Sequence, residues 1–335
     1  MKYPIELDTL LSRTEDHHQR MTSFAFLCLG VIESLTKGTI DASDAIKIFF
    51  HAGNCRFVRM ALHHESADEM MGHGVQLNDL SDILPAEEAQ RELQRELAVI
   101  TGGGRGIGAA ISRRLAAEGY RILLTYHTDS ASAEGVIANL RENGLDCAAV
   151  RADCGHRDDV YSLANHPEIH GGIHVLVLNH GRYERSPAAE QDLHALTRTM
   201  DVNFHGAVAV WKTLSPNLKP NARIIVLGSQ LGIKGNPQGA DYAASKGALH
   251  AWARSLAVDV ARTGQRVNII APGTIETGLI AKDTPEKRAR REDAIPMGRL
   301  GQPEEVAAVA SFLAGPDSSY MTGAVLHVNG GFYLP

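Results

Sequence analysis

The feature that most constrains the fold is a glycine-rich stretch, Thr-Gly-Gly-Gly-Arg-Gly-Ile-Gly, at residues 101–108. The apolar residues 97–100 precede it with the pattern of a short buried strand, and residues 109–118 follow with the pattern of a helix. A glycine-rich turn in this context lets the backbone approach a pyrophosphate at the N-terminus of the helix. The stretch therefore predicts a dinucleotide-binding unit of strand, turn and helix.

The glycines of this stretch are not expected to be equivalent. Three of them, Gly102, Gly106 and Gly108, are interpreted as the glycines that the turn requires. The other two, Gly103 and Gly104, are interpreted as plain loop residues.

Strand and helix patterns alternate along the rest of this segment. In chain order, the predicted strands and helices lie at residues 121–126, 132–143, 147–151, 174–178 and 190–213. Alternation with short links predicts a parallel sheet that helices cover on both faces. We therefore expect an α/β fold of the doubly wound, Rossmann type, preceded by a small all-α domain.

The end of the second predicted strand bears on the choice of cofactor. An NAD-binding chain usually carries an acid about twenty residues past the glycines, which binds the ribose 2′-hydroxyl. Here Tyr126 and His127 occupy that place, and Arg105 lies in the turn, where it could meet a 2′-phosphate. NADP(H) is therefore favoured over NAD(H), and the alternative is that Asp129 bends back to the ribose. Asp153, after the third strand, is either a contact of the adenine amino group or a turn residue.

A second pattern, Tyr242-x-x-x-Lys246, lies in a run of Ala and Ser that is expected to be helical. This spacing puts both side chains on one face of a helix. A nearby ammonium favours the phenolate, and a tuned phenol is a good general acid for a carbonyl that becomes an alkoxide. Ser229, just past the apolar run 224–227, is a candidate to hold the carbonyl oxygen. The pair by itself is a weak signal, because any solvated helix face can carry it.

Composition excludes several classes of protein. The 335 residues are 44% hydrophobic and 21% charged, and a net charge of -6 argues against nucleic acid as the main partner. The four cysteines show neither CxxC spacing nor a disulfide framework. The longest apolar run, residues 24–32, is too short to cross a bilayer and lies too far from the N-terminus for a signal peptide. A cytoplasmic protein without a membrane segment is expected.

Charge divides the chain into two parts. Residues 1–94 carry fifteen acidic and eight basic side chains, whereas the remainder is nearly balanced. Apolar residues in the first part recur at helical steps, so we expect a helical domain of unknown role at residues 1–94 and a catalytic domain at residues 95–335. The six histidines of the first part have no HxxxH spacing, and no metal site is expected.

The motifs together resemble one family. Thr101–Gly108, Asn179–Gly181, Asn203, Ser229, Tyr242, Lys246 and Pro272-Gly273 occur in the order and spacing of the short-chain dehydrogenase/reductase family. The resemblance covers residues 97–335. It implies a doubly wound, seven-stranded parallel sheet and an NAD(P)(H)-dependent oxidoreductase.

The resemblance implies a role for each matched residue. Tyr242 would donate the proton, Lys246 would lower its pKa and hold the nicotinamide ribose, and Ser229 would orient the carbonyl. Asn203 would hold a water in a proton relay, or would be a structural Asn. With the residues identified above, the candidate cofactor contacts are Gly102, Arg105, Gly106, Ile107, Gly108, Tyr126, His127, Asp153, Asn179, Gly181, Tyr242, Lys246, Pro272, Gly273, Ile275 and Thr277.

A closer resemblance is to bacterial 3-oxoacyl-[acyl carrier protein] reductases. Gly235-Asn236 and residues 295–301 and 320–331 carry it. It implies NADPH-dependent reduction of a 3-oxoacyl thioester, bound to acyl carrier protein or CoA, in fatty-acid biosynthesis, by a homo-oligomer (tetramer or dimer). Sugar, steroid and polyketide reductases share parts of these motifs, so another ketone is the alternative. A further alternative is that the N-terminal helices tether the enzyme to an assembly.

Two features depart from the pattern or leave its meaning open. His180 stands where the family has a small residue, and either reshapes the cofactor pocket or points outward. The charged segment 278–297 lies where the family carries a substrate lid. Its charges either form a solvated helix face or dock a carrier protein.

Overall fold

The computed structural model describes Phe24 and residues 96–278, 280–281 and 283–335. The predicted helical domain at residues 1–94 lies outside the described residues, apart from Phe24. Glu96–Pro335 forms one compact unit.

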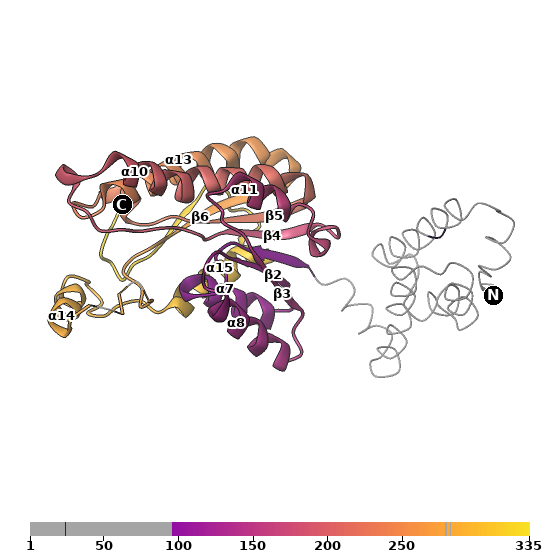
Figure 1. The fold of residues 1–335 in the computed structure, drawn as a ribbon, viewed down its shortest axis with the longest axis horizontal. Helices are drawn as coiled ribbons and strands as arrows, with labels where there is room; N and C mark the ends of the chain where they lie inside the picture. Colours follow the sequence, from indigo (N-terminus) through magenta and orange to yellow (C-terminus); the bar gives the residue numbers. More distant parts are fainter. Residues whose placement is uncertain (1–23, 25–95, 279, 282) are drawn as a thin grey trace, which may run out of the picture. The chain divides into compact units, whose positions relative to one another are not determined.

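A seven-stranded parallel sheet forms the centre of this unit (Figure 1), as the resemblance implied. The order across the sheet is β3-β2-β1-β4-β5-β6-β7, and every neighbouring pair is parallel. The strands are β1 (Leu97–Ile100), β2 (Arg121–Tyr126), β3 (Cys147–Arg151), β4 (Ile173–Leu178), β5 (Leu218–Leu227), β6 (Arg266–Pro272) and β7 (Val325–Val328). The order reverses between β1 and β4, and a ligand of a doubly wound sheet binds at the carboxyl ends of the strands beside such a switch point.

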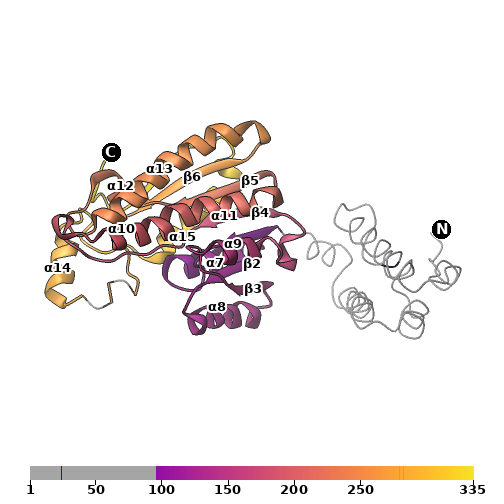
Figure 2. The same cartoon turned by 45° about the horizontal axis from the view of Figure 1, so that its top comes forward.

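Helices cover both faces of the sheet (Figures 1 and 2). One layer contains α7 (Gly106–Ala117), α8 (Ser130–Glu142) and α15 (Pro303–Ala314). The other contains α9 (Arg157–Leu163), α10 (Leu193–Met200), α11 (Gly206–Leu214) and α13 (Ala240–Val260). Each layer buries its own apolar cluster against the sheet, because the side chains of a strand alternate between the two faces. The predicted doubly wound arrangement is confirmed.

Two further α-helices follow strands β5 and β6. They are α12 (Leu231–Lys234), between β5 and α13, and α14 (Pro285–Asp293), which stands out from the sheet in Figure 1. In the part of the chain that the structure describes, no helix is long and apolar enough to cross a bilayer. Nor do three or more His, Cys, Asp or Glu side chains among these residues gather into a group that could hold a metal ion.

The helix predicted at residues 190–213 is interrupted. After α10, residues Asp201–His205 form a π-helical turn before α11 begins. A π-turn inserts an extra residue into a helix and often marks a functional site. Asn203 lies at its centre and is fully buried.

The interpretation of Gly103 and Gly104 as plain loop residues is wrong. A Cβ added to Gly103 would lie 2.6 Å from Leu124 Cβ, and one added to Gly104 would lie 2.8 Å from Ala133 Cβ. Real Cβ atoms do not approach so closely, so both glycines are needed for the turn to pack on β2 and α8.

Candidate functional site

The functional residues lie where strands of the sheet end. The glycine turn follows β1, Asn179–Gly181 follows β4, Ser229 follows β5, and Gly273 follows β6. Carboxyl ends of parallel strands meet at one edge of the sheet, so the tertiary structure gathers segments that are far apart in the sequence.

Tyr242 and Lys246 lie on consecutive turns of α13, as predicted. Lys246 is 3% exposed, and its Nζ donates a hydrogen bond to the Leu227 carbonyl at 2.6 Å. The same Nζ lies 5.7 Å from the centre of the Tyr242 ring. The ammonium is therefore anchored to the end of β5, beside the phenol.

The pKa of the Tyr242 phenol is raised to about 12. Burial is the main cause and Tyr183 adds to it, while a hydrogen bond with the Ser229 side chain acts in the opposite direction. Burial also lowers the pKa of the Lys246 ammonium to about 8. Burial is thus the dominant influence on the Tyr242 phenol in this structure, and the lowering of its pKa by Lys246 stays a prediction.

Ser229 is buried directly after β5. Its Oγ accepts a hydrogen bond from the Leu231 N–H at 3.1 Å, and its own N–H donates to His250 Nε2 at 3.3 Å. The Ser229 side chain lies near enough to the Tyr242 phenol to act on its pKa, so one carbonyl oxygen could accept from both hydroxyls.

The Asn203 side chain forms its hydrogen bonds with other residues of the protein. Its Oδ1 accepts from the Arg182 N–H at 2.7 Å, and its Nδ2 donates to the Arg182 carbonyl and to Ser245 Oγ, each at 2.9 Å. These bonds join the π-turn to the loop after β4 and to α13. A Cβ added to Gly181 would lie 3.4 Å from Asn203 Oδ1 and 3.7 Å from Lys246 Nζ, so Gly181 fits between these two side chains. This geometry supports a structural role for the side chain.

The glycine turn has the compactness that a pyrophosphate site needs. Gly102 and Gly106 have φ angles of 63° and 53°, which favour glycine. Asn179 Nδ2 donates to the Thr101 and Gly102 carbonyls at 2.9 and 3.0 Å. A Cβ on Gly108 would lie 2.2 Å from the Gly102 oxygen. The turn therefore fits a dinucleotide, and the hydrogen bonds of the Asn179 side chain hold its backbone in place.

The remaining predicted contacts come from the loop after β6. Gly273 donates its N–H to the Val328 carbonyl at 2.9 Å, and Ile275 is buried. A Cβ added to Gly106 would lie 3.4 Å from Thr277 Cγ2, so this loop reaches the glycine turn. The structure thereby brings the loop after β6 next to the glycine turn, as a shared dinucleotide site would require.

Known proteins share this fold and sequence. The family model described as Enoyl-(Acyl carrier protein) reductase matches residues 102–333. The 3beta-hydroxysteroid dehydrogenase 1 of Eggerthella lenta is 37% identical over 249 residues, which are 72% of this chain and 95% of the relative. The chain belongs to the short-chain dehydrogenase/reductase family. It is accordingly an NAD(P)-dependent oxidoreductase that acts on a ketone or alcohol.

Other members of the short-chain dehydrogenase/reductase family match at similar levels. The 3-oxoacyl-[acyl-carrier-protein] reductase of Vibrio cholerae is 33% identical over 72% of this chain and 99% of the relative. The crystal structure of a blue fluorescent protein from a metagenomic library, in complex with NADPH, has a TM-score of 0.68 at 34% identity and covers 71% of this chain and 98% of that one. The expected special closeness to 3-oxoacyl reductases is not supported, because a hydroxysteroid dehydrogenase matches at least as well.

The region expected to meet the adenosine end contains both candidate 2′ contacts of this short-chain reductase. Arg105 is exposed at the start of α7. Asp129 caps α8 by accepting from the Ser132 N–H at 3.1 Å, and this hydrogen bond is the main reason that its pKa is lowered, with Arg105 contributing. Asp153 accepts from the Gly155 N–H at 2.9 Å, as a turn residue does.

Tyr126 and His127 stand at the end of β2. Tyr126 is half-buried there, and its carbonyl accepts from the Ala152 N–H at 2.8 Å. His127 is exposed, with its Nε2 lying 3.4 Å from Asp153 Oδ2. Their contact with the cofactor ribose stays a prediction.

His180 points inward. Its Nδ1 lies 2.7 Å from Thr101 Oγ1, and its Nε2 is buried without a hydrogen-bond partner among the described residues. Burial, together with the charge of Lys246, lowers the pKa of His180 to about 4, so the ring is neutral at pH 7. The alternative in which His180 points outward is wrong.

Most of the described charges in the segment 278–297 are paired within the chain. Arg288 forms a bidentate pair with Glu276 at 2.6 and 2.8 Å. Asp283 lies 2.8 Å from Lys287 Nζ and 2.6 Å from Arg291 Nε. Of the four described cations in this segment, Lys287, Arg288 and Arg291 have acidic partners, which supports the reading of the charge run as a solvated helix face.

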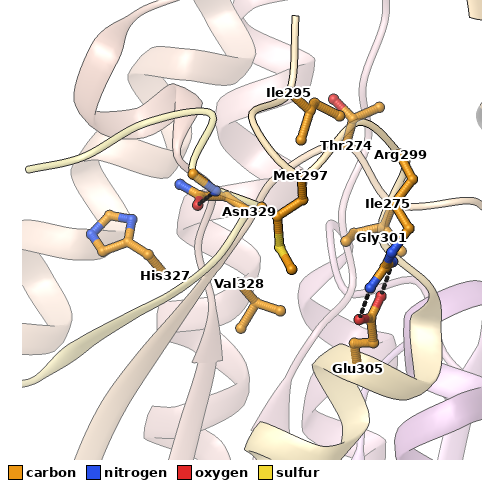
Figure 3. A pocket seen from close by; sticks show the side chains of 12 residues that line it. Thr274, Ile275, Ile295, Met297, Arg299, Gly301, Glu305, His327, Val328 and Asn329 are labelled. Atoms are coloured by element: carbon orange, nitrogen blue, oxygen red, sulfur yellow. Dashed lines mark hydrogen bonds and ion pairs between the residues drawn. The ribbon is translucent and has the colours of Figure 1, made fainter. Parts of the chain in front are cut away.

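A pocket of about 340 Å³ lies behind the loop after β6 (Figure 3). Ile275, Ile295, Met297 and Val328 contribute its apolar wall, and the bidentate Arg299–Glu305 pair closes one side. None of the predicted catalytic side chains lines it. The pocket therefore lies outside the catalytic group.

One residue beside the catalytic group was missed. The Tyr183 ring lies 4.8 Å from the Tyr242 ring. Tyr183 stands two positions after Gly181, in a loop with no regular pattern, so no periodicity marks it. Only the tertiary structure brings Tyr183 next to Tyr242, which lies far from it in the sequence.

Proposed function

We propose that this protein reduces a 3-oxoacyl thioester, carried by acyl carrier protein or CoA, to the 3-hydroxyacyl form with NADPH. The observation that supports the proposal is the convergence of Ser229, Tyr242 and Lys246 beside a glycine turn compact enough for a dinucleotide. The thioester substrate is supported by the motifs at residues 295–301 and 320–331, and by relatives that are 3-oxoacyl-[acyl-carrier-protein] reductases.

In this proposal each side chain has a separate task. The nicotinamide supplies the hydride when it is bound. The Tyr242 hydroxyl donates its proton to the carbonyl oxygen as the alkoxide forms, and Ser229 Oγ orients that oxygen. Lys246 holds the ribose, and Asn203 fixes the loop that carries Gly181.

The candidate cofactor contacts divide by the part of the cofactor they would meet. The turn residues Gly102, Gly106, Ile107 and Gly108 would bind the pyrophosphate. Pro272, Gly273, Ile275 and Thr277 would surround the nicotinamide. Arg105, Tyr126, His127 and Asp153 would border the adenosine, and Asn179 with Gly181 would support the ribose side.

NADPH is favoured over NADH because Arg105 and Asp129 differ in their availability to a ligand. Arg105 is exposed and able to meet a 2′-phosphate, whereas Asp129 is engaged as the cap of α8. Relatives with NADPH or NADP in their crystal structures agree with this choice.

The test is oxidation of NADPH, and separately of NADH, by the purified protein with a short 3-oxoacyl thioester. We expect turnover with NADPH, and at least a tenfold lower kcat/KM with NADH, or about 1.4 kcal/mol. Tyr242→Phe should abolish turnover and leave NADPH binding intact, because it removes only the hydroxyl group that donates the proton. Retained turnover in this variant would refute the role of Tyr242.

A second candidate is reduction or oxidation of another ketone or alcohol. A hydroxysteroid dehydrogenase and a glucose dehydrogenase match this chain about as well as the 3-oxoacyl reductases do. A panel with a 3-oxosteroid, a sugar and a 3-oxoacyl thioester distinguishes these substrates. NADPH binding without thioester turnover would favour this second candidate.

We further propose that residues 1–94 form a helical docking or assembly module, and that the catalytic domain forms a cytoplasmic homo-oligomer. The acidic composition of this segment supports the docking proposal. Comparing the partners and the number of subunits in solution of the full chain with those of a chain that begins at Gln94 tests it. The same partners and the same number of subunits for both chains would refute the proposed module.

A further inference from the structure

The Tyr183 ring is packed on the residue proposed to donate the proton. The centres of the Tyr183 and Tyr242 rings are 4.8 Å apart, and their planes are inclined by 59°. Tilted aromatic pairs at this distance attract one another beyond the effect of buried area. Tyr183 therefore restricts where the Tyr242 ring can lie.

The Tyr183 hydroxyl is itself held from two sides. It donates to the Gln238 carbonyl at 3.0 Å and accepts from Asn236 Nδ2 at 3.0 Å. Gly239 leaves room for the ring, because a Cβ there would lie 2.6 Å from Tyr183 Cε2. The loop that leads into α13 is thus fitted around this one side chain.

These contacts lie at the N-terminus of α13, the helix that carries Tyr242. α13 begins at Ala240, directly after Gly239, and has no side-chain cap. Tyr242 thus lies in the first turn, where backbone N–H groups have no partner within the helix. A further bond, from the Ala188 N–H to the Pro237 carbonyl at 3.1 Å, joins the same two loops.

We propose that Tyr183 is a positioning residue for the reaction, which holds the Tyr242 phenol and the start of α13 in the geometry that donates a proton. The inference rests on the proposed role of Tyr242 as the proton donor. Two parts of Tyr183 contribute: the ring packs on Tyr242, and the hydroxyl fixes the preceding loop.

Three variants separate these parts. Tyr183→Leu removes both ring and hydroxyl, Tyr183→Phe retains the ring, and Tyr161→Leu is the matched control. Tyr161 is 59% exposed on α9 and lies outside the proposed site.

Kinetics with NADPH and any ketone that the wild type reduces give the first readout. We expect kcat to fall about tenfold or more in Tyr183→Leu, because a displaced donor loses its alignment. NADPH affinity should not change, and Tyr183→Phe should recover most of the rate. If Tyr183 had a purely structural role, Tyr183→Leu and Tyr183→Phe would both have a lower melting temperature, and the retained ring of Tyr183→Phe would not restore kcat. Unchanged kcat in Tyr183→Leu would overturn the proposal.

A second readout needs no substrate. Tyrosine labelled with ¹³C in the ring gives a Tyr242 resonance that is identified by its loss in Tyr242→Phe. We expect this resonance to move in Tyr183→Leu, since the neighbouring ring current is gone, and to stay close to its wild-type position in Tyr183→Phe and Tyr161→Leu. An unmoved resonance in Tyr183→Leu would overturn the inferred packing. A wild type that reduces no 3-oxoacyl thioester would refute the proposed substrate, while this measurement still decides the role of Tyr183.

Discussion

Tyr242 and Lys246 illustrate how burial acts on single residues. Loss of water raises the pKa of the phenol to about 12 and lowers that of the ammonium to about 8, since in both cases the neutral form is favoured. Tyr242 therefore keeps its proton across the neutral range and is ready to donate it. Alcohol oxidation, which requires the phenolate, should speed up as the pH rises.

The buried ammonium should also reduce stability. The pKa of Lys246 in the folded chain, about 8, is below the ordinary value of 10.5, so the unfolded chain binds more protons between these pH values. Stability should rise with pH through this window. Lys246→Met should remove that pH dependence and stabilise the protein at pH 7 by up to about 3 kcal/mol, while abolishing turnover.

Urea denaturation at a series of pH values measures this effect. Lys212→Met, which changes an exposed lysine of α11, is the matched control and should leave the pH dependence as it is in the wild type. If Lys246→Met is less stable than the wild type at pH 7, the hydrogen bond to the Leu227 carbonyl outweighs the burial cost and the prediction fails.

At the scale of elements, the glycine turn depends on close packing as well as on its φ angles. Gly103 and Gly104 lie against β2 and α8 at distances that no side chain permits. Sequence reasoning missed their role because the contacting residues, Leu124 and Ala133, come from elements further along the chain. The π-turn at Asn203 was missed for a similar reason, since bonds to Arg182 and Ser245 maintain it.

A pair of alanine substitutions tests this reading of the turn. Gly103→Ala should destabilise the protein by about 1–3 kcal/mol, as overpacking of a core does. Gly135→Ala, at an exposed position in α8 with nothing within 4 Å of the added Cβ, should stabilise it by about 1 kcal/mol. Denaturation midpoints provide the comparison, and effects of the same sign at both sites would contradict it.

At the scale of the whole molecule, the described fold and all the proposed site residues lie within Glu96–Pro335. The two apolar clusters, one on each face of the sheet, are formed within this unit. The unit thus has its own core, which is the main requirement for independent folding.

A chain that begins at Gln94 should therefore fold and keep its NADPH-dependent activity. The expected change in kcat/KM is less than about threefold, because no residue proposed to contact cofactor or substrate is removed. Circular dichroism and turnover with the substrate of the full chain measure this outcome. Aggregation of the shorter chain would show that residues 1–93 cover an apolar surface of the catalytic unit.

The sequence by itself determined the class of fold and the chemistry. Local patterns sufficed for strands β1 to β4, the glycine turn and the Tyr242–Lys246 pair, because periodicity and side-chain spacing are properties of neighbouring residues. The number of strands in the sheet was implied only by the family resemblance. Tertiary structure alone decided the environment of those residues: the direction of the Tyr242 pKa shift, the inward position of His180 and the contact with Tyr183. Burial and contacts between distant segments exist only after the chain has folded, so no local pattern records them.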